Sequence, residues 1–234
     1  CQAHLFGQQN AGEMSNNTKD QLNASTMKLD ASDVLYGFDS KKSEVLGDYY
    51  LDLAWRKGTV IFYPAAEKQK SDTLRGFPMR LDLESSELEF QTQFGIKAVS
   101  PREIQSFEFW EDGGKTALRF VNAREFGEKG KPFFLEKLAE GKLSLLLHHK
   151  LWIREPTYNA ALDVGSKDTE IRKDKVFYYF KSGKLEKFKP SQGNLLKIMQ
   201  NRKSSMEKFL EKNKLDLDEA GDLVKVFQHY NGLD

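Results

Sequence analysis

The sequence lacks most features that would identify an enzyme or a membrane-spanning protein. Its 234 residues include one cysteine, Cys1, so no disulfide can form within the chain. No run of 18 apolar residues is present, so no segment has the composition of a transmembrane helix. The phosphate-binding loop, the dinucleotide-binding fingerprint and the G-x-S-x-G nucleophile motif are also missing, and we expect no cofactor.

The overall charge is nearly balanced, but its distribution is uneven. The net charge is +1, whereas residues 172–214 contain 13 Lys and Arg against 4 Asp and Glu. A basic band can indicate an anionic partner, and it can equally be a solvated lysine face offset by acidic neighbours. Apolar residues make up 39% of the chain, including 17 Phe, which suffices for a substantial core.

The N-terminal residues favour a leader. Residues 8–33 are rich in Gln, Asn, Ser, Thr and Asp and cannot bury enough apolar surface to fold, so residues 1–33 are predicted to be a flexible lead-in. Cys1 fits the lipidated first residue of a bacterial lipoprotein, with these residues as its tether. Alternatively, the first eight residues are the end of a signal peptide, or the boundary is arbitrary. The first two alternatives predict export to the periplasm, the outer envelope or the medium.

Residues 34–190 show the two-residue alternation of β-strands. Leu51, Leu53 and Trp55 predict a strand over residues 50–56, followed by a turn at Lys57-Gly58. Hairpins are predicted at residues 79–92, with a turn at Ser85-Ser86, at 104–122 and at 176–188, with a turn at Ser182-Gly183. Residues 143–153 are apolar on most of both faces, which indicates a central or helix-covered strand.

Residues 191–234 have the spacing of amphipathic helices. Ser204 and Glu207 have capping-box spacing, and Asp216 and Glu219 repeat that spacing before an apolar stripe that ends near Gly232. These stripes need a sheet face or one another for burial, so the helical segment is expected to form one domain with the β-rich region.

The first candidate site is the long polar loop over residues 158–169, because loops on a β scaffold often carry function. The candidate ligand-binding residues are Tyr158, Asp163, Lys167 and Asp168. The alternative is that Asp163 and Asp168 only bond to the loop's own backbone amides. The spacing of its acids does not match an EF-hand.

The second candidate is the basic hairpin that follows, in which lysines alternate with aromatic residues. Its candidate anion-binding residues are Lys181, Lys184, Lys187 and Lys189. Such interleaving suits single-stranded nucleic acid, but an exported protein rarely meets it, so an anionic membrane surface or a polysaccharide is the better hypothesis. A hairpin with aromatics inside and lysines outside explains the pattern equally well.

The histidine pair His148-His149 is the obvious place to look for a metal or a general base. Neighbouring residues of a strand point to opposite faces, so the pair cannot ligate one ion without distortion. The sequence has neither H-x-x-x-H nor H-E-x-x-H spacing, and we predict no metal site and no catalytic residue.

Three segments carry a resemblance to a known family, namely residues 156–168, Phe177-Tyr178-Tyr179 and residues 222–231. Together they resemble a family of exported bacterial proteins over residues 49–231. The resemblance implies export and a β-rich region followed by C-terminal helices. It implies no assigned activity and therefore no catalytic residues.

The sequence thus predicts an α+β protein with a mostly antiparallel, curved or rolled sheet and a C-terminal helical segment packed on it. The function it favours is a non-enzymatic binding or structural module, exported or associated with the cell envelope. Its expected partner is an envelope component, a polysaccharide or an anionic membrane surface. The alternative is a hydrolase whose acidic residues converge only in three dimensions.

Overall fold

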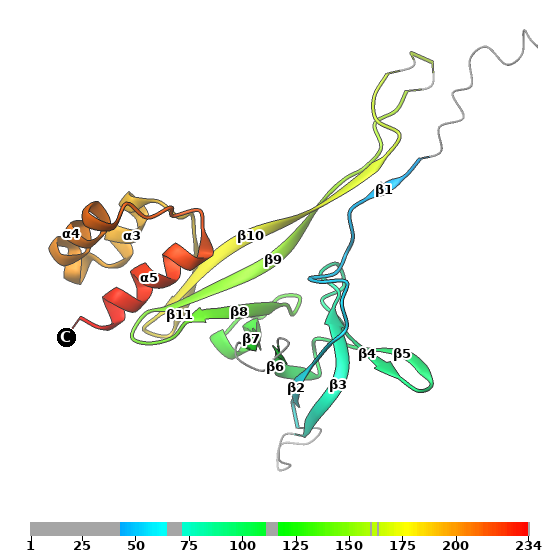
Figure 1. The fold of residues 1–234 in the computed structure, drawn as a ribbon, viewed down its shortest axis with the longest axis horizontal. Helices are drawn as coiled ribbons and strands as arrows, with labels where there is room; N and C mark the ends of the chain where they lie inside the picture. Colours follow the sequence, from blue (N-terminus) through cyan, green and yellow to red (C-terminus); the bar gives the residue numbers. More distant parts are fainter. Residues whose placement is uncertain (1–42, 65–71, 111–116, 160, 163, 234) are drawn as a thin grey trace, which may run out of the picture. The chain divides into compact units, whose positions relative to one another are not determined.

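The computed structural model describes residues 43–64, 72–110, 117–159, 161–162 and 164–233. Among these residues the strands come first and the α-helices follow, as Figure 1 shows. The strands are β1 (Val45–Leu46), β2 (Arg56–Phe62), β3 (Thr73–Leu81), β4 (Leu88–Thr92), β5 (Gly95–Val99), β6 (Ile104–Trp110), β7 (Ala117–Asn122), β8 (Phe134–Ala139), β9 (Ser144–Arg154), β10 (Thr169–Lys181) and β11 (Lys184–Phe188). The helical elements are η1 (Ala123–Phe126), α3 (Gln192–Ile198), η2 (Gln200–Arg202), α4 (Lys203–Asn213) and α5 (Ala220–Asn231).

The described strands form one large mixed sheet that does not close. Their order is β1-β10-β9-β8-β7-β6-β2-β3-β4-β5, and β11 pairs with β10 beside this path. Pairing between described strands is antiparallel except where β1 runs parallel to β10. The predicted α+β class is therefore confirmed.

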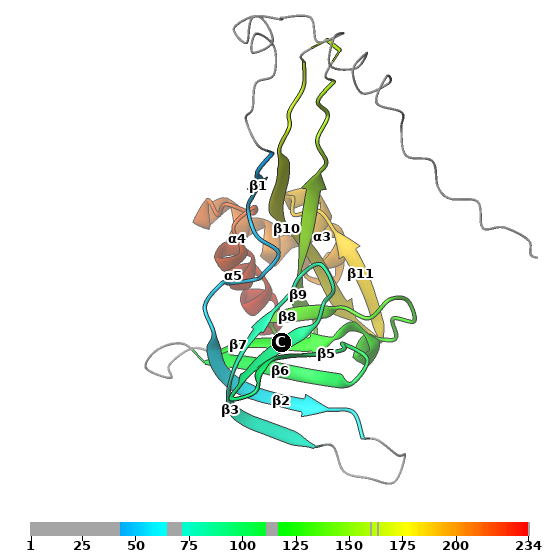
Figure 2. The same cartoon turned by 90° about the vertical axis from the view of Figure 1, so that its right-hand side faces the viewer.

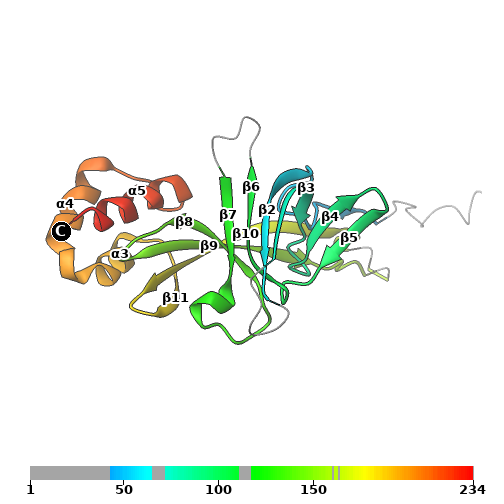
Figure 3. The same ribbon diagram turned by 90° about the horizontal axis from the view of Figure 1, so that it is seen from below.

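The sheet twists strongly across its width. In Figure 2, β9 and β10 run up the view, whereas β2 and β6 run across it. Twist of this kind follows from the right-handed preference of each strand. The helices lie beside β8 and β9 in Figure 3. The strands β3, β4 and β5 lie at the other end of the sheet, away from the helices.

Register divides the side chains of the sheet between two faces. The inner face is marked by four residues paired in one row across β7 to β10, namely Phe120, Glu136, Leu147 and Phe177. The outer face is marked by their neighbours in sequence, Val121, Leu135, Leu146 and Tyr178. Alternate residues of a strand point to opposite faces, so these markers fix the face of every residue in the regular parts of those strands.

Two clusters of buried residues lie on the inner face. One lies where α3, α4 and α5 meet the sheet and includes Leu145, Leu147 and Phe227. The other is rich in phenylalanine and joins β2, β3, β4, β6, β7 and β8 around Phe107 and Phe120. The first of these clusters confirms the prediction that the helical segment packs on the sheet. A smaller cluster on the outer face buries Leu146, so β9 is covered on both faces over Leu145–Leu147, as its sequence predicts. The rest of the strand is not covered in this way, and Trp152 is 42% exposed.

The hairpin predictions are confirmed where the structure describes them. The strands β3 and β4 pair around the Ser85-Ser86 turn, and β10 and β11 pair around Ser182-Gly183. Ser86, Ser182 and Gly183 have φ values of 61°, 51° and 80°, the left-handed conformation that tight hairpin turns require. The strands predicted within residues 104–122 are β6 and β7, whose connection lies outside the described residues.

The prediction of a strand over residues 50–56 is wrong. Only Tyr50 forms an isolated bridge, to Asp82, and β2 begins at Arg56. The carboxylate of Asp52 accepts from the amide of Ala54 at 3.0 Å, a local bond that competes with strand pairing. The predicted turn at Lys57-Gly58 is also wrong, since both residues lie inside β2, next to a register shift.

The two predicted capping boxes are wrong as well. The helix α4 begins at Lys203, and its N-cap is Arg202, without a side-chain cap bond. The N-cap of α5 is Glu219, which also makes no such bond. Instead the carboxylate of Asp222, in the first turn of α5, accepts from the amide of Asp216 at 2.9 Å and fixes the chain that leads into the helix. The predicted stop of α5 at Gly232 is confirmed.

Candidate functional site

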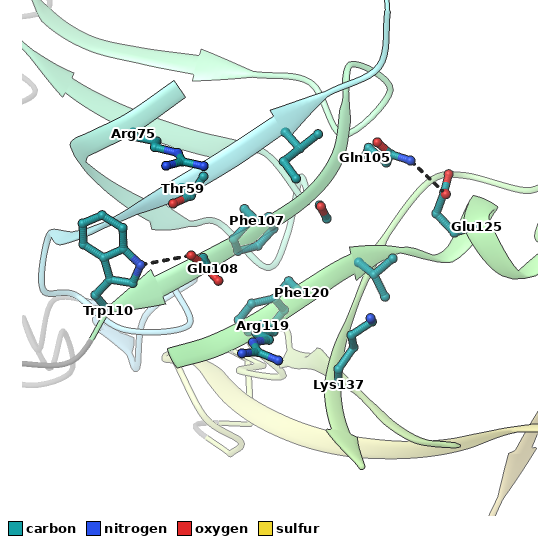
Figure 4. Close-up of a pocket in the computed structure, with 13 residues that line it drawn as sticks. Thr59, Arg75, Gln105, Phe107, Glu108, Trp110, Arg119, Phe120, Glu125 and Lys137 are labelled. Carbon is teal, nitrogen blue, oxygen red and sulfur yellow. Dashed lines mark hydrogen bonds between the residues drawn. The ribbon is translucent and has the colours of Figure 1, made fainter. Parts of the chain in front are cut away.

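An open groove lies on the outer face of the sheet where β2, β6 and β7 run side by side. Its volume is about 530 Å³, within the range of small-molecule sites. The side chains that line it come mainly from these three strands, with single contributions from β3, η1 and β8 (Figure 4). The inner face beneath it is packed with Phe107 and Phe120, so the floor of the groove has a rigid support.

A row of polar residues crosses the groove. Arg75 of β3 pairs with Thr59 of β2, Thr59 with Glu108 of β6, and Glu108 with Arg119 of β7. Strand register therefore aligns a cation, a hydroxyl, a carboxylate and a second cation. Neighbouring strands lie about 4.8 Å apart, so the backbones of Arg75 and Arg119 are separated by about 14 Å across three strand spacings.

Glu108 holds the aromatic side chain of the groove. The indole Nε1 of Trp110 donates to Oε1 of Glu108 at 3.1 Å, two residues along the same face of β6 (Figure 4). This bond fixes the orientation of a ring that stays 39% exposed. An exposed tryptophan with its polar atom already satisfied offers a ligand its apolar ring.

The other end of the groove is organised around Glu125 in η1. Its carboxylate accepts from Gln105 Nε2 at 3.1 Å and from the hydroxyl of Tyr63 at 2.8 Å. Burial, followed by the bond to Glu125, raises the pKa of Tyr63 well above its usual range, so the phenol keeps its proton at neutral pH. The guanidinium of Arg124 lies 4.8 Å from the centre of the Tyr63 ring.

Buried Asn122 explains why η1 starts where it does. Its side-chain amide donates to the carbonyls of Pro101 at 2.7 Å and Ile104 at 2.9 Å, and its Oδ1 accepts from the amide of Arg124 at 3.1 Å. Asparagine is a favoured helix N-cap because it can satisfy an amide of the first turn in this way. Asn122 thus ties η1, and with it Glu125, to the start of β6.

The cations of the groove differ in their partners. Lys137 forms an ion pair with Glu140 outside the row. Among the described residues, by contrast, no carboxylate lies within 4.0 Å of the guanidinium of Arg75 or of Arg119. Both arginines are exposed and can bind an added anion without breaking an ion pair of the described chain.

The predicted loop site is only partly described, since Asp163 lies outside the described residues. The segment is the end of the β9–β10 hairpin, where backbone amides of Thr157 and Asn159 bond across to Ser166 and Val164 at 2.8 Å. The ammonium of Lys167 lies 4.3 Å from the centre of the Tyr158 ring, so these two predicted residues do meet.

Asp168 bonds to a distant part of the chain. Its carboxylate accepts from the amide of Glu44 at 3.0 Å, and the amide of Thr169 donates to the carbonyl of Glu44 at 3.0 Å. Asp168 therefore anchors the chain before β1 to the start of β10, so its observed bond is not one to the loop's own amides. A ligand-binding role for this loop stays a prediction.

The four predicted anion-binding lysines do not gather on one surface. Lys181 donates from Nζ to the carbonyl of Ile198 at 2.8 Å, so its ammonium serves the end of α3. Lys184 is exposed opposite Lys181 in the hairpin. Lys187 pairs in register with Tyr178 and lies on the outer face, and Lys189 is exposed beyond the end of β11.

The histidine pair points to opposite faces of β9, as predicted. His149 Nε2 lies 2.6 Å from Oε2 of Glu136 on the inner face. His148 lies on the outer face, where its ring centre is 4.4 Å from that of Phe133. Burial, with smaller contributions from the positive charges of His149, Lys150 and Lys187, lowers the pKa of His148 to about 4.

No group of three or more His, Cys, Asp or Glu within the described part of the chain is arranged to hold a metal ion. Nor does any described helix have the length and apolar content needed to cross a bilayer. Cys1, the lipidation site under the lipoprotein alternative, lies outside the described residues, as does the rest of the lead-in.

No family model, curated protein or solved structure matches this chain. The resemblance to exported bacterial proteins therefore stays a prediction, and the groove has to be interpreted from its own chemistry. Sequence reasoning missed it because Ser106, Glu108 and Trp110 alternate with buried phenylalanines, as on any solvated strand face. The available signal was Trp110, a large apolar residue on the polar side of that alternation.

Proposed function

We propose that this protein is a non-enzymatic binding module of the bacterial cell envelope and that it holds its ligand in the groove of β2, β6 and β7. The observation that carries the proposal is the pair of arginines, Arg75 and Arg119, without carboxylate partners in the described chain, beside a ring fixed by Glu108. Preorganised polar groups next to an exposed aromatic ring are the usual anatomy of a ligand site.

The chemistry of the groove supports binding more directly than catalysis. Its two lining carboxylates are engaged at different places, Glu108 with Trp110 and Glu125 with Gln105 and Tyr63. Each therefore already orients a neighbouring side chain. An open groove also leaves a bound ligand in contact with water, which favours reversible recognition of part of a larger molecule.

The alternative function, a hydrolase, rests on the carboxylates of Glu108 and Glu125. Glu108 and Glu125 both line the groove, and paired carboxylates are the machinery of glycoside hydrolysis. If the protein cleaves what it binds, Glu108→Gln and Glu125→Gln abolish product formation while the protein still binds the substrate. Mass spectrometry of each ligand after prolonged incubation distinguishes the two functions, because a binding module returns it unchanged.

The cellular location is the part of the proposal that rests on sequence alone. The polar composition of residues 8–33 and the resemblance of three later segments support export. Mass spectrometry of the N-terminus of protein isolated from its own cells tests this. An acylated Cys1 identifies a lipoprotein, a start at Gln8 or Gln9 identifies a cleaved signal peptide, and an extended, uncleaved N-terminus contradicts both.

Two exposed tryptophans allow a controlled test of the groove. Trp110 lies in it and is 39% exposed, whereas Trp152 of β9 is 42% exposed and does not line it. Trp110→Ala and Trp152→Ala are compared by calorimetric titration with neutral and acidic oligosaccharides, envelope polymers and vesicles with and without anionic lipid. We expect at least one soluble ligand whose binding is lost in Trp110→Ala and kept in Trp152→Ala.

Two results would contradict the proposal. One is a panel in which nothing binds the unsubstituted protein. The other is a ligand bound equally well by both tryptophan variants, which would move the site away from the groove. Binding to anionic vesicles alone, unchanged in Trp110→Ala, would likewise replace the groove with a membrane-facing surface.

A further inference from the structure

The charge pattern of the groove restricts the chemical class of its ligand, given the binding function proposed above. We infer that the groove binds a hydroxyl-rich carboxylic acid of the saccharide type, such as a uronic acid unit of an acidic polysaccharide. Four features carry this inference: the two arginines, the carboxylate between them, the indole ring beside it and the amide and hydroxyl groups that also line the groove.

Arg75 and Arg119 favour a ligand with negative charge. A guanidinium presents its donors in a planar fork that matches a carboxylate or phosphate, and such charge-assisted bonds are among the strongest hydrogen bonds in proteins. Neither arginine has a carboxylate within 4.0 Å among the described residues, so a ligand carboxylate can bind each guanidinium without displacing one of theirs.

Glu108 argues against a ligand that carries only negative charge. It lies between the two arginines in the register row, and Glu125 lies at another edge of the same groove. A DNA backbone offers its phosphates without hydroxyl donors for these two carboxylates, whereas a sugar acid offers hydroxyls as well as acid groups, which favours the sugar acid. Only one oxygen of Glu108 accepts from Trp110, so its other oxygen is available to a ligand hydroxyl.

Trp110 supplies the surface on which a sugar ring would rest. The indole nitrogen is bonded to Glu108, so what faces the groove is the apolar ring. A pyranose has an apolar face of C–H groups and a rim of hydroxyls. The groove offers an aromatic ring for the apolar face, and hydrogen-bond acceptors and donors beside that ring for the hydroxyls. Thr59, Ser106 and Gln105 also line the groove and add neutral hydrogen-bonding groups.

The dimensions suit a short stretch of a longer chain. The backbones of Arg75 and Arg119 are about 14 Å apart, from three strand spacings. Consecutive acidic units of a polymer, one near each arginine, would match that span. The groove is open, which allows a polymer to enter and leave.

The test uses trigalacturonic acid and its fully methyl-esterified form, in which every carboxylate is replaced by a neutral ester. Calorimetric titration is carried out with the unsubstituted protein and with Arg75→Gln, Arg119→Gln and the double variant. Arg102→Gln is the matched control, because Arg102 is exposed and does not line the groove. Thermal unfolding of each variant confirms that it is folded.

We expect the acid to bind and the ester to bind at least tenfold more weakly. Each groove arginine variant should lower the affinity for the acid by roughly tenfold or more, as expected for loss of a charge-assisted hydrogen bond. Arg102→Gln should leave it unchanged. The affinity should also fall as sodium chloride is raised, because the groove is open to solvent.

The inference is overturned, with the proposed function intact, if acid and ester bind equally in a Trp110-dependent manner and the arginine variants match the unsubstituted protein. It is also overturned if neither trimer binds while another ligand of the wider panel depends on Trp110. If no ligand depends on Trp110, the groove itself is not the site, and the proposed function fails with the inference.

Discussion

The ammonium of Lys181 donates to the backbone carbonyl of Ile198 at 2.8 Å, which joins the end of β10 to the last residue of α3. The same ammonium lies 5.9 Å from the centre of the Tyr230 ring in α5. A lysine that the sequence places in a basic surface is therefore part of the contact between sheet and helices. A cation near the carbonyl end of a helix is also favoured by the helix dipole.

Replacing Lys181 should accordingly destabilise the protein. Lys181→Met keeps the aliphatic stem but removes the donor, and we expect the free energy of unfolding to fall by roughly 1–2 kcal/mol. Lys184→Met is the control, because Lys184 is exposed opposite it and its ammonium makes no hydrogen bond or ion pair among the described residues. Urea unfolding measures both. Equal stability of the two variants would show that the bond contributes nothing.

Gly58 is required by the close approach of β2 and β6. A Cβ atom at this position would lie 1.9 Å from the carbonyl oxygen of Glu108, far inside contact distance. Because that oxygen belongs to the backbone of a paired strand, it cannot move aside cheaply. We expect Gly58→Ala to lower the free energy of unfolding by roughly 3 kcal/mol or more, since severe overpacking is among the most damaging single changes.

Gly130 provides the comparison for this experiment. A Cβ atom there would meet nothing within 4 Å, so Gly130→Ala should change the stability little. Thermal and urea unfolding of the two variants measure the difference. If Gly58→Ala unfolds at the same urea concentration as the unsubstituted protein, the two strands are not as close as described.

Most of the sheet could be predicted because its signals are local. A turn such as Ser182-Gly183 and the alternation on either side of it lie within a few residues, and the hairpin forms as predicted. The helix starts could not be predicted in the same way. The helix α4 follows η2 directly, so the chain is already helical when it reaches Ser204 and needs no cap there.

The groove could not be predicted because it depends on pairing between distant segments. Arg75, Thr59, Glu108 and Arg119 meet only through three strand pairings, one of them with a register shift beside Gly58. Each of the four is unremarkable in its own strand, since polar residues commonly alternate with apolar ones. Sequence alternation gives the face of a residue but not which residues of other strands lie beside it.

Asn122 should be essential for the position of η1. It is fully buried, and Asn122→Ala would leave the carbonyls of Pro101 and Ile104 and the amide of Arg124 without their partner. We expect the free energy of unfolding to fall by roughly 2–4 kcal/mol, because unsatisfied buried polar groups are costly. Asn213→Ala, at an exposed residue whose side chain donates to the carbonyl of Phe209, is the control and should cost less than about 1 kcal/mol.

His148 should make the stability depend on pH in the mildly acidic range. Its pKa is about 4 in the folded protein, lowered first by burial and then by the positive charges of His149, Lys150 and Lys187, whereas the ordinary value is 6.5. Between these values the unfolded chain binds a proton that the folded protein does not. The free energy of unfolding is therefore unaffected by the protonation of His148 above about pH 6.5, and it decreases as the pH falls from 6.5 toward 4.

Replacing His148 with Phe removes this proton and keeps a ring against Phe133. Urea unfolding at several pH values between 4 and 7 should show a decline in the unsubstituted protein that is smaller in His148→Phe. The difference between a pKa of 6.5 and one of about 4 corresponds to a loss of roughly 3 kcal/mol in the free energy of unfolding once the pH has fallen to about 4. His229→Phe is the control, because its ring stacks on Phe209 at the surface of the helices, away from β9. Parallel pH profiles for the unsubstituted protein and His148→Phe would show that the buried imidazole does not cause the decline.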